Sequence, residues 1–249
     1  MISGVILAKN EEKNIAKAIT SLSFCDEIVV IDNDSTDRTI EVAKKHKASV
    51  LKNNSTDFSE LRNFGLKEAR GEWILFLDAD ELVSEELKTN IVNEIKNQSN
   101  LSYYIKRRDH FWGRELKFGE IKKARTKGII RLVKKDSGNW TGSVHEVFVP
   151  HDSSGTLEGY IEHYPHQTYA EFLSEINTYS TLRAKELQKQ GTRFSIFQLL
   201  FLPPAKFFYT YVLLLGFLDG PAGFAYAFTM SFHSFLVRAK LYQYAHLKT

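Results

Sequence analysis

The chain is poor in residues that build covalent or metal-linked frameworks. Among its 249 residues there is one cysteine, Cys25, with only five prolines and two methionines. A single cysteine forms no disulfide within the chain and supplies no cysteine-rich metal site, so we expect a reducing, cytoplasmic compartment. Internal repeats and low-complexity tracts are also missing, and the length suits one sizeable globular domain plus a smaller appendage.

Strong charge and a leader-like segment are absent as well. The formal net charge is +3 and the pI is about 8.7, which is too mildly basic to indicate a nucleic-acid partner. The first apolar run, residues 5–8, is short and precedes Lys9, Asn10 and Glu11, whereas a signal peptide begins with basic residues and has a longer apolar core. We therefore expect no signal peptide.

Two glycine-rich phosphate motifs are missing. No GxGxxG follows the first expected strand, and the P-loop pattern does not occur. Their absence argues against a dinucleotide fold of the dehydrogenase type and against a P-loop enzyme.

The chain does contain a buried-strand pattern that stops at two carboxylates. Residues 73–77 are five consecutive apolar residues, followed by Asp78 and Asp80. The run is short and lacks alternation, which is typical of a parallel strand buried on both faces. Ligands in open α/β sheets bind beyond the carboxyl ends of strands, so both side chains are expected at that edge, where they suit a divalent cation holding phosphates. The alternative is a turn that only caps the next helix.

Strands and helices alternate along the first hundred residues, which predicts an α/β fold with a mostly parallel sheet. Acidic or amide side chains follow three of the expected strands. Such residues suit a site that contacts a base and ribose and holds a diphosphate through a metal. They are Asn10 and Glu11, then Asp32, Asn33 and Asp34, then Asp78 and Asp80.

Basic and aromatic residues alternate over residues 106–114, after an expected strand at 103–105. We interpret this segment as a loop facing an anionic or sugar ligand, with Arg107 and Arg114 as candidate acceptor contacts. A nucleic-acid interpretation is weaker because the patch is short. The basic residues at 120–127 fit an anionic acceptor or a solvated face equally well.

A titratable pair, His145 and Glu146, follows Trp140. Such a pair beside an aromatic residue fits a general base, although an ordinary surface pair is the simpler interpretation. His163 and His166 are expected to pack or to form hydrogen bonds, since too few further ligands accompany them for a zinc site.

The composition shifts after a long helix expected at residues 169–190. Residues 194–235 are rich in Phe, Leu, Tyr and Ala, with breaks expected at Pro203–Pro204 and at residues 219–221. The uncharged run at residues 207–218 has 12 residues, whereas a membrane-spanning helix needs about 20. We expect helices over 194–240 that lie in a membrane interface or form a dimer contact, with Lys206, Arg238 and Lys240 near lipid head groups. A helical hairpin packed on the catalytic domain is the alternative.

Four segments together resemble the inverting glycosyltransferases of family 2, which have the GT-A fold. They are residues 8–12 (AKNEE), 31–39 (IDNDSTDRT), 62–65 (RNFG) and 71–81 (GEWILFLDADE). Later segments resemble a narrower branch, the lipopolysaccharide core glycosyltransferases that add a β-linked hexose. Those segments are Arg131-Leu132, Trp140 with residues 144–146, His163, and residues 216–220.

The resemblance implies a role for each matching residue. Asp32, Asn33 and Arg62 would contact the nucleotide, with Asn10 and Glu11 also on the donor side, and Asn33 replaces an aspartate common in the family. Asp78 would lie near the ribose, and Asp80 would ligate Mg²⁺ or Mn²⁺. Glu146 would be the base in place of the family's Glu-Asp motif, Arg131 would stabilise the leaving group, and Arg107, Arg114, Trp140 and His145 would meet the acceptor.

The expected enzyme thus transfers a hexose with inversion from a nucleotide-diphosphate sugar, with UDP favoured, to a glycan or glycolipid acceptor of the cell envelope. Residues 1–165 would be the catalytic domain and residues 166–249 a helical region, on a cytoplasmic protein peripheral to the inner membrane. A homo-oligomer contact through the helical region is the alternative. Two rival hypotheses are a phosphatase of the haloacid dehalogenase class and a non-catalytic nucleotide-sugar binding module.

Overall fold

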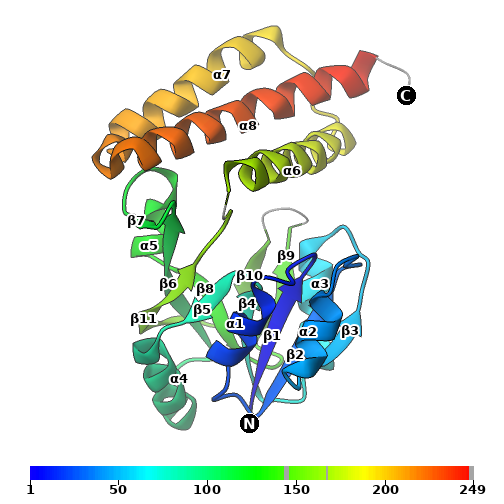
Figure 1. Cartoon of the computed structure of the whole chain (residues 1–249), viewed down its shortest axis with the longest axis vertical. Helices are drawn as coiled ribbons and strands as arrows, with labels where there is room; N and C mark the ends of the chain where they lie inside the picture. The colour runs from blue at the N-terminus through cyan, green and yellow to red at the C-terminus, as the bar shows by residue number, and fades with distance from the viewer. Residues whose placement is uncertain (143–145, 167, 247–249) are drawn as a thin grey trace. The chain divides into compact units, whose positions relative to one another are not determined.

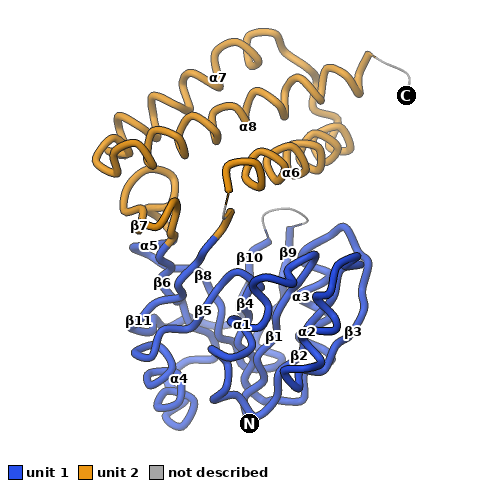
Figure 2. Tube along the Cα trace, viewed as in Figure 1, with its two compact units in different colours: residues 1–108, 124–164 blue, residues 109–123, 165–249 orange. Residues whose placement is uncertain are grey.

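The computed structural model of the chain describes residues 1–142, 146–166 and 168–246. It consists of two compact units, shown in Figure 2: unit 1 comprises residues 1–108 and 124–164, and unit 2 comprises residues 109–123 and 165–249. Residues 109–123, which sequence patterns assign to the catalytic domain, are therefore part of the helical unit. His145 lies outside the described residues.

Unit 1 begins with strands and helices in alternation, as the sequence predicts (Figure 1). The four strands β1 (Ile2–Ala8), β2 (Glu27–Asp32), β3 (Ser49–Lys52) and β4 (Trp73–Asp78) are parallel and lie in the order β3-β2-β1-β4. The helices between them are α1 (Ile15–Ser21), α2 (Thr39–Lys45) and α3 (Phe58–Glu68). Parallel neighbours require such crossovers, because the chain must return to the same end of the sheet.

The sheet continues beyond β4 with antiparallel strands. β8 (Ile129–Lys134) pairs with β4 and with β6 (Ser102–Phe111), and β11 (Gly155–His163) pairs with β5 (Glu81–Val83). Helix α4 (Glu85–Asn97) follows β5, and its N-terminal cap is Ser84. A separate antiparallel pair is formed by β9 (Gly138–Thr141) and β10 (Val147–Pro150).

Alternate residues of β4 enter two different cores, which is why this strand is apolar throughout. Trp73, Leu75 and Leu77 pack into the core that includes residues of α1 and α4. Ile74 and Phe76 pack into the opposite core, with residues of α3 and the β9–β10 pair. The prediction of a parallel strand buried on both faces is confirmed.

Two local predictions were wrong. Residues 106–111 are not a loop but the second half of β6, in which Lys106 pairs with an acid of β11. Pro203 and Pro204 do not interrupt a helix but lie within α7 (Ile196–Phe208). The N-terminal cap of α3 is Asp57, whose carboxylate accepts the N–H groups of Ser59 and Glu60.

Unit 2 consists of three long helices and a small strand-containing segment. The helices are α6 (Tyr169–Lys189), α7, and α8 (Gly220–His246), with the short helical turns η2 (Tyr209–Leu213) and η3 (Gly216–Asp219) between α7 and α8. The segment contains the end of β6, β7 (Arg114–Leu116), η1 (Gly119–Ile121) and the start of α5 (Lys122–Thr126). Its core includes Phe111, Leu116 and Ile121 packed with Phe172 and Ala222.

Replacing Phe76 by alanine should lower the free energy of unfolding by about 3–5 kcal/mol, because the substitution leaves a cavity beneath a fully buried strand. Phe76→Leu keeps most of the volume and should cost clearly less. Urea unfolding followed by circular dichroism measures both. Equal stability of the alanine variant and the wild type would contradict the packing described for β4.

Candidate functional site

The carboxyl ends of three parallel strands meet at one edge of the sheet. In the strand register, Ala8 pairs with Asp32 and Leu7 pairs with Asp78, so β1, β2 and β4 end side by side. The polar residues that follow each strand are therefore neighbours, as the strand order requires. The prediction of a polar edge built from the first, second and fourth strands agrees with this register.

Asp78 stands between two buried arginines. Its Oδ1 accepts a hydrogen bond from Arg62 Nη2 at 2.8 Å, and its Oδ2 accepts one from Arg131 Nη2 at 2.7 Å. Arg62 comes from α3 and Arg131 from β8, and each side chain is only 4% exposed. Buried guanidinium groups require carboxylate partners, so this arrangement fixes the end of β4 relative to both elements.

Glu81 forms the second acidic centre of this cluster. It is fully buried, and its Oε1 lies 3.0 Å from Arg131 Nη2 and 3.3 Å from Arg107 Nη1. Its Oε2 accepts the backbone N–H of Asp78 at 2.9 Å, which closes the turn that presents Asp78 and Asp80. Glu81 therefore positions both arginines and the turn, a role that sequence analysis missed.

Glu146 reaches the same cluster from the segment before β10. Its Oε1 lies 2.7 Å from Arg62 Nε, and its side chain is 15% exposed. The neighbouring Asn63 pairs with the backbone of Trp140 in both directions, through Nδ2 to the carbonyl oxygen and from the N–H to Oδ1. This amide clamp holds β9 against α3 and so places the segment containing Glu146 near Arg62.

The charges of this cluster are balanced, and they determine the ionisation of Asp78. Burial alone raises the pKa of Asp78, but the charges of Arg131 and Arg62 outweigh burial and hold that pKa well below its ordinary value of 3.8. The cluster contains equal numbers of guanidinium and carboxylate groups. They are Arg62, Arg107 and Arg131, with Asp78, Glu81 and Glu146.

Asp80 and His163 form a pair of potential metal ligands beside the charged cluster. His163 is the last residue of β11 and pairs in register with Glu81, which brings its ring next to Asp80. Asp80 Oδ2 and His163 Nε2 are 3.2 Å apart. The Asp80 carboxylate is a ligand type that Mg²⁺ and Mn²⁺ prefer, and the His163 imidazole nitrogen is a ligand type of transition metals, so the pair can contribute to holding a divalent cation. Within the described ranges no three His, Cys, Asp or Glu side chains gather for a metal, so further ligands must come from a bound diphosphate or water.

Asp32 has a buried acceptor atom with no partner. The residue is fully buried; its Oδ2 accepts the N–H of Ser35 at 3.3 Å, while Oδ1 has no hydrogen bond. An unpaired buried carboxylate oxygen is costly, and it suits an N–H group supplied by a ligand.

The other predicted donor residues tie loops together. Asn10, at φ 57°, accepts the N–H of Thr36 at 2.8 Å, and the N–H of Glu11 donates to Thr39 at 2.7 Å. Asn33 Nδ2 donates to the carbonyl of Ser55 at 2.7 Å. These contacts connect the segments after β1, β2 and β3; donor binding by the three residues stays a prediction.

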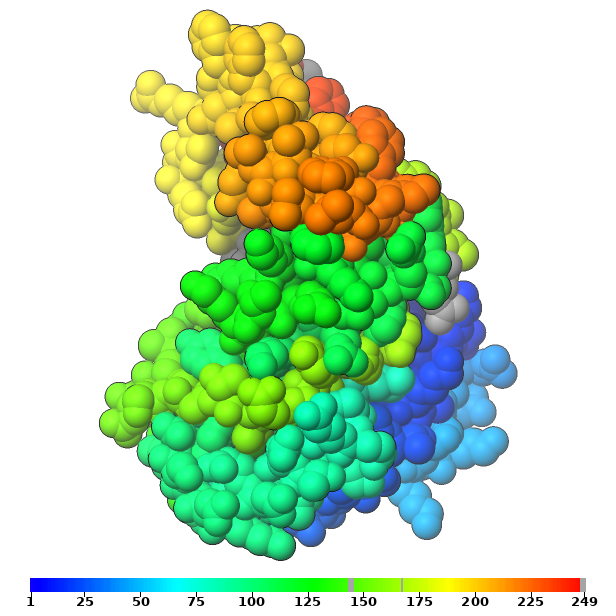
Figure 3. All heavy atoms as spheres, turned by 90° about the vertical axis from the view of Figure 1, so that its left-hand side faces the viewer, coloured from blue at the N-terminus to red at the C-terminus, as the bar shows by residue number. Residues whose placement is uncertain are grey.

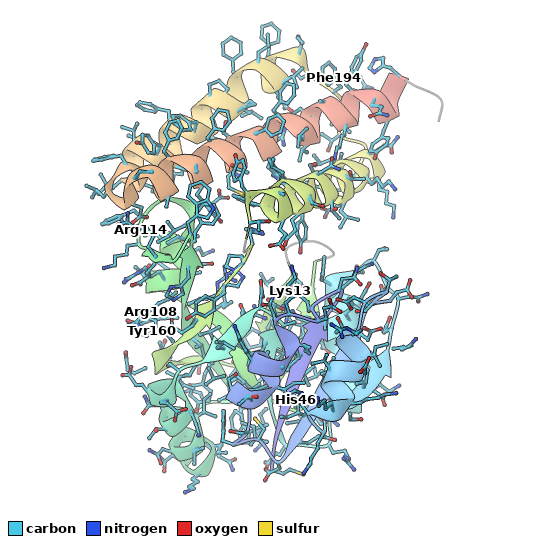
Figure 4. All side chains as sticks on the ribbon, in the orientation of Figure 1. Lys13, His46, Arg108, Arg114, Tyr160 and Phe194 are labelled. Carbon is cyan, nitrogen blue, oxygen red and sulfur yellow. The ribbon has the colours of Figure 1, made fainter. Side chains whose placement is uncertain are left out.

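The predicted acceptor residues lie in different surroundings. Trp140 is buried in the core, against Phe76 and under the Arg62 guanidinium at 4.8 Å, so its burial favours packing over the predicted acceptor contact. Arg107 is ion-paired with Glu81 in unit 1, whereas Arg114 is an exposed residue of β7 in unit 2 (Figure 4). Nearby on β6, Arg108 lies over the Tyr160 ring at 3.6 Å.

Comparison with known proteins gives one family. The model of glycosyl transferase family 2 matches residues 3–152. An uncharacterized glycosyltransferase of Rickettsia typhi is 31% identical over 96% of this chain and 86% of its own length. The lipopolysaccharide core biosynthesis glycosyltransferase LpsC of Rhizobium meliloti is 28% identical over 99% of this chain and 94% of its own. The structure of S. aureus TarS 1-349 in complex with UDP-GlcNAc aligns with a TM-score of 0.50 at 15% identity, covering 98% and 91% of the two chains.

Substituting Asp78 by asparagine should give a pH-dependent loss of stability. The folded-state pKa is depressed, so the carboxylate contributes stability above its unfolded pKa and loses that contribution as the pH falls below 3.8. The stability difference between wild type and Asp78→Asn should be constant above about pH 5 and shrink towards pH 3. Urea unfolding across this range measures it. Asp34→Asn, at an exposed residue, is the control for the amide substitution itself. A stability difference that does not change with pH for Asp78→Asn would contradict the ion pairs.

Proposed function

Because this chain belongs to glycosyl transferase family 2, we propose that it transfers a hexose, with inversion, from a nucleoside-diphosphate sugar to a cell-envelope glycan. The observation that supports this most is the placement of Asp80 and His163 next to the Arg62–Asp78–Arg131 cluster at the strand ends. A divalent cation is part of the proposal. The site contains the parts for holding a diphosphate and for removing a proton.

The nucleotide binds, in this proposal, where β1 and β2 end. The unpaired Asp32 Oδ1 accepts an N–H from the edge of the base. Uracil offers such a group at N3, whereas cytosine has an acceptor there, so a cytidine donor would leave two acceptors facing each other. UDP is the favoured nucleotide, and the similarity to a protein crystallised with UDP-GlcNAc is consistent with it.

The proposal includes a metal because the positive and negative charges of the arginine–carboxylate cluster balance each other. Every guanidinium in the cluster already faces a carboxylate, so the cluster offers a diphosphate no net positive charge. A Mg²⁺ or Mn²⁺ held by Asp80 and His163 would supply that charge to the leaving diphosphate. Asp78, held by both arginines, is then oriented towards the ribose rather than towards the metal.

Transfer proceeds as a single displacement. The acceptor hydroxyl oxygen forms a bond to the anomeric carbon from the face opposite the diphosphate, while the bond from that carbon to the diphosphate oxygen breaks with its electron pair. Glu146 takes the hydroxyl proton. Arg62 holds the Glu146 carboxylate in place through Nε, and Arg131, whose Nε and Nη1 have no hydrogen-bond partner among the described residues, supports the leaving group by donating hydrogen bonds.

The proposed acceptor and cellular location are inferred from the relatives of this chain. LpsC is named for lipopolysaccharide core biosynthesis, and it aligns with nearly the whole of this chain. We therefore favour a lipopolysaccharide-core-like acceptor, met at the cytoplasmic side of the inner membrane, with Arg107 as a contact for its anionic groups.

The phosphatase hypothesis is less compatible with the geometry. A haloacid-dehalogenase-type enzyme needs the first aspartate of the motif as a nucleophile, and in this chain both oxygens of Asp78 are ion-paired with buried arginines. Turnover of a generic phosphate ester with Mg²⁺ would favour it. Metal-dependent binding of a nucleotide sugar without any transfer would instead favour the non-catalytic module.

Metal-dependent donor binding provides the first test. UDP in hundredfold excess over its Kd, with Mn²⁺, should raise the melting temperature by about 5–10 °C. Asp80→Asn and His163→Ala should each abolish the part of the shift that requires Mn²⁺. Asp152→Asn and His151→Ala, at exposed residues of the same unit, are the matched controls and should behave as wild type. A shift unchanged by a chelator would contradict the metal site.

Glu146→Gln provides the second test, because the amide keeps a hydrogen bond to Arg62 but cannot take a proton. The turnover number should fall by about 10²–10⁴, with the KM for the donor within about twofold of wild type. Release of the nucleoside diphosphate measures turnover. Glu158→Gln, at an exposed acid of β11, is the control and should keep full activity. Full activity of Glu146→Gln would refute the base assignment but not the family.

A further inference from the structure

The helices of unit 2 expose large apolar side chains in stripes. On α8, Phe224, Phe228, Phe232 and Phe235 follow one another at helical spacing, and each is at least 38% exposed. On α7 and η2 the exposed fraction reaches 71% at Phe197 and 60% at Leu213. This surface, which we call the apolar face, also includes Leu200, Phe201, Phe208, Tyr209 and Leu218.

Small and hydroxyl-bearing residues of α8 are buried, while Phe207 of α7 and Phe224 of α8 pack edge to face with ring centroids 5.7 Å apart. Ala227, Ser231 and Ser234 of α8 are buried, and Ser231 Oγ donates to the carbonyl of Pro203 on α7 at 2.7 Å. In Figure 3, α7 (yellow) and the first half of α8 (orange) lie directly against each other. Helices that pack in water bury their large apolar residues, whereas helices in lipid pack through small and hydroxyl-bearing ones. The buried small and hydroxyl-bearing side chains of α8 follow the pattern of helices in lipid.

Length and composition agree with a lipid environment. The stretch Ile196–Leu213 is 18 residues long with mean hydropathy 1.3, and 11% of it is buried; among the described residues this is the one helix long and apolar enough to cross a membrane. Yet Lys206 in its middle is ion-paired with Glu120 of η1 at 3.1 Å. The buried Asp219 accepts the N–H groups of Lys117 and Phe118 at 2.9–3.1 Å. These bonds tie both helices to a polar segment, which favours lying along a membrane over spanning it.

We propose that the apolar face inserts into one leaflet of an anionic lipid bilayer, with α7 and α8 lying along its surface. Exposed basic residues lie next to the segments that carry the face. Lys117, Lys122 and Lys123 flank η1, whose Gly119 N–H bonds to Leu214 in the α7–α8 connection at 3.0 Å, and Arg193 precedes α7. They place positive charge where anionic head groups lie.

The alternative is that the apolar face binds the same face of a second copy of the chain in a symmetric dimer. In a twofold contact the same patch faces itself, so the basic residues of one copy would meet those of the other, which is unfavourable. A lipid surface of opposite charge removes that repulsion. The inference rests on the helices of unit 2 alone and is independent of the proposed sugar transfer.

The test is flotation of the full chain with vesicles of phosphatidylcholine containing about one-third phosphatidylglycerol. Wild type should float with these vesicles and float less with phosphatidylcholine alone. Phe224→Gln/Phe228→Gln should weaken binding at least about tenfold, because each buried ring contributes strongly to insertion. Val149→Gln, at an exposed apolar residue of unit 1, is the matched control and should float as wild type.

A tryptophan placed in the apolar face reports how deeply the face inserts into the bilayer. The fluorescence of the tryptophan introduced by Phe201→Trp should be quenched by brominated acyl chains more strongly than the fluorescence of the wild-type tryptophans. A chain that does not float and sediments as a dimer, which the Phe224→Gln/Phe228→Gln variant converts to a monomer, would overturn the proposal. Flotation unchanged in that variant would overturn it equally.

Discussion

The sharing of Asp78 by two buried arginines is the interaction on which the rest of unit 1 depends. Arg62 and Arg131 come from a helix and a strand that approach the end of β4 from different directions. A buried guanidinium without a carboxylate would be strongly destabilising, so the chain cannot place either residue there without Asp78 and Glu81. The polar edge is therefore held in shape by ion pairs within the chain, and the proposed donor would meet a preformed site.

The polar edge of unit 1 and the apolar face of unit 2 both depart from the usual distribution of residues, in which apolar side chains are buried and charged ones are exposed. In unit 1 a fully buried acid and two buried bases occupy positions that apolar residues would fill more cheaply. In unit 2 phenylalanines face outwards while serines pack inside. Departures of this kind mark places where a sequence has been shaped by something other than stability. The buried charges of unit 1 suit a charged ligand, and the exposed phenylalanines of unit 2 suit an apolar environment.

Much of unit 1 could be predicted from the chain, because local patterns determine it. The apolar run of β4, the Ser84 cap and the strand–helix alternation are short-range features, and the strand ends that form the polar edge follow from them. The basic run of β6 was misjudged as a loop because its partners, including Glu158 and Glu162, are about fifty residues away. Ion pairs between residues so far apart in the sequence produce no local sequence pattern from which they could be predicted. The same holds for His163 and Asp80, which antiparallel register alone brings together.

The path of the chain between the units has one further consequence. Strand β6 begins in unit 1 and ends in unit 2, and the chain passes between the units again after Lys123 and after Tyr164. The helical region is thus interleaved with the catalytic region rather than attached behind it. A chain truncated after residue 165 would lack the helices that cover Phe111, Leu116 and Ile121. These apolar side chains would then be exposed to solvent and would favour aggregation. A soluble minimal enzyme would have to be engineered by replacing residues 109–123 with a short turn as well.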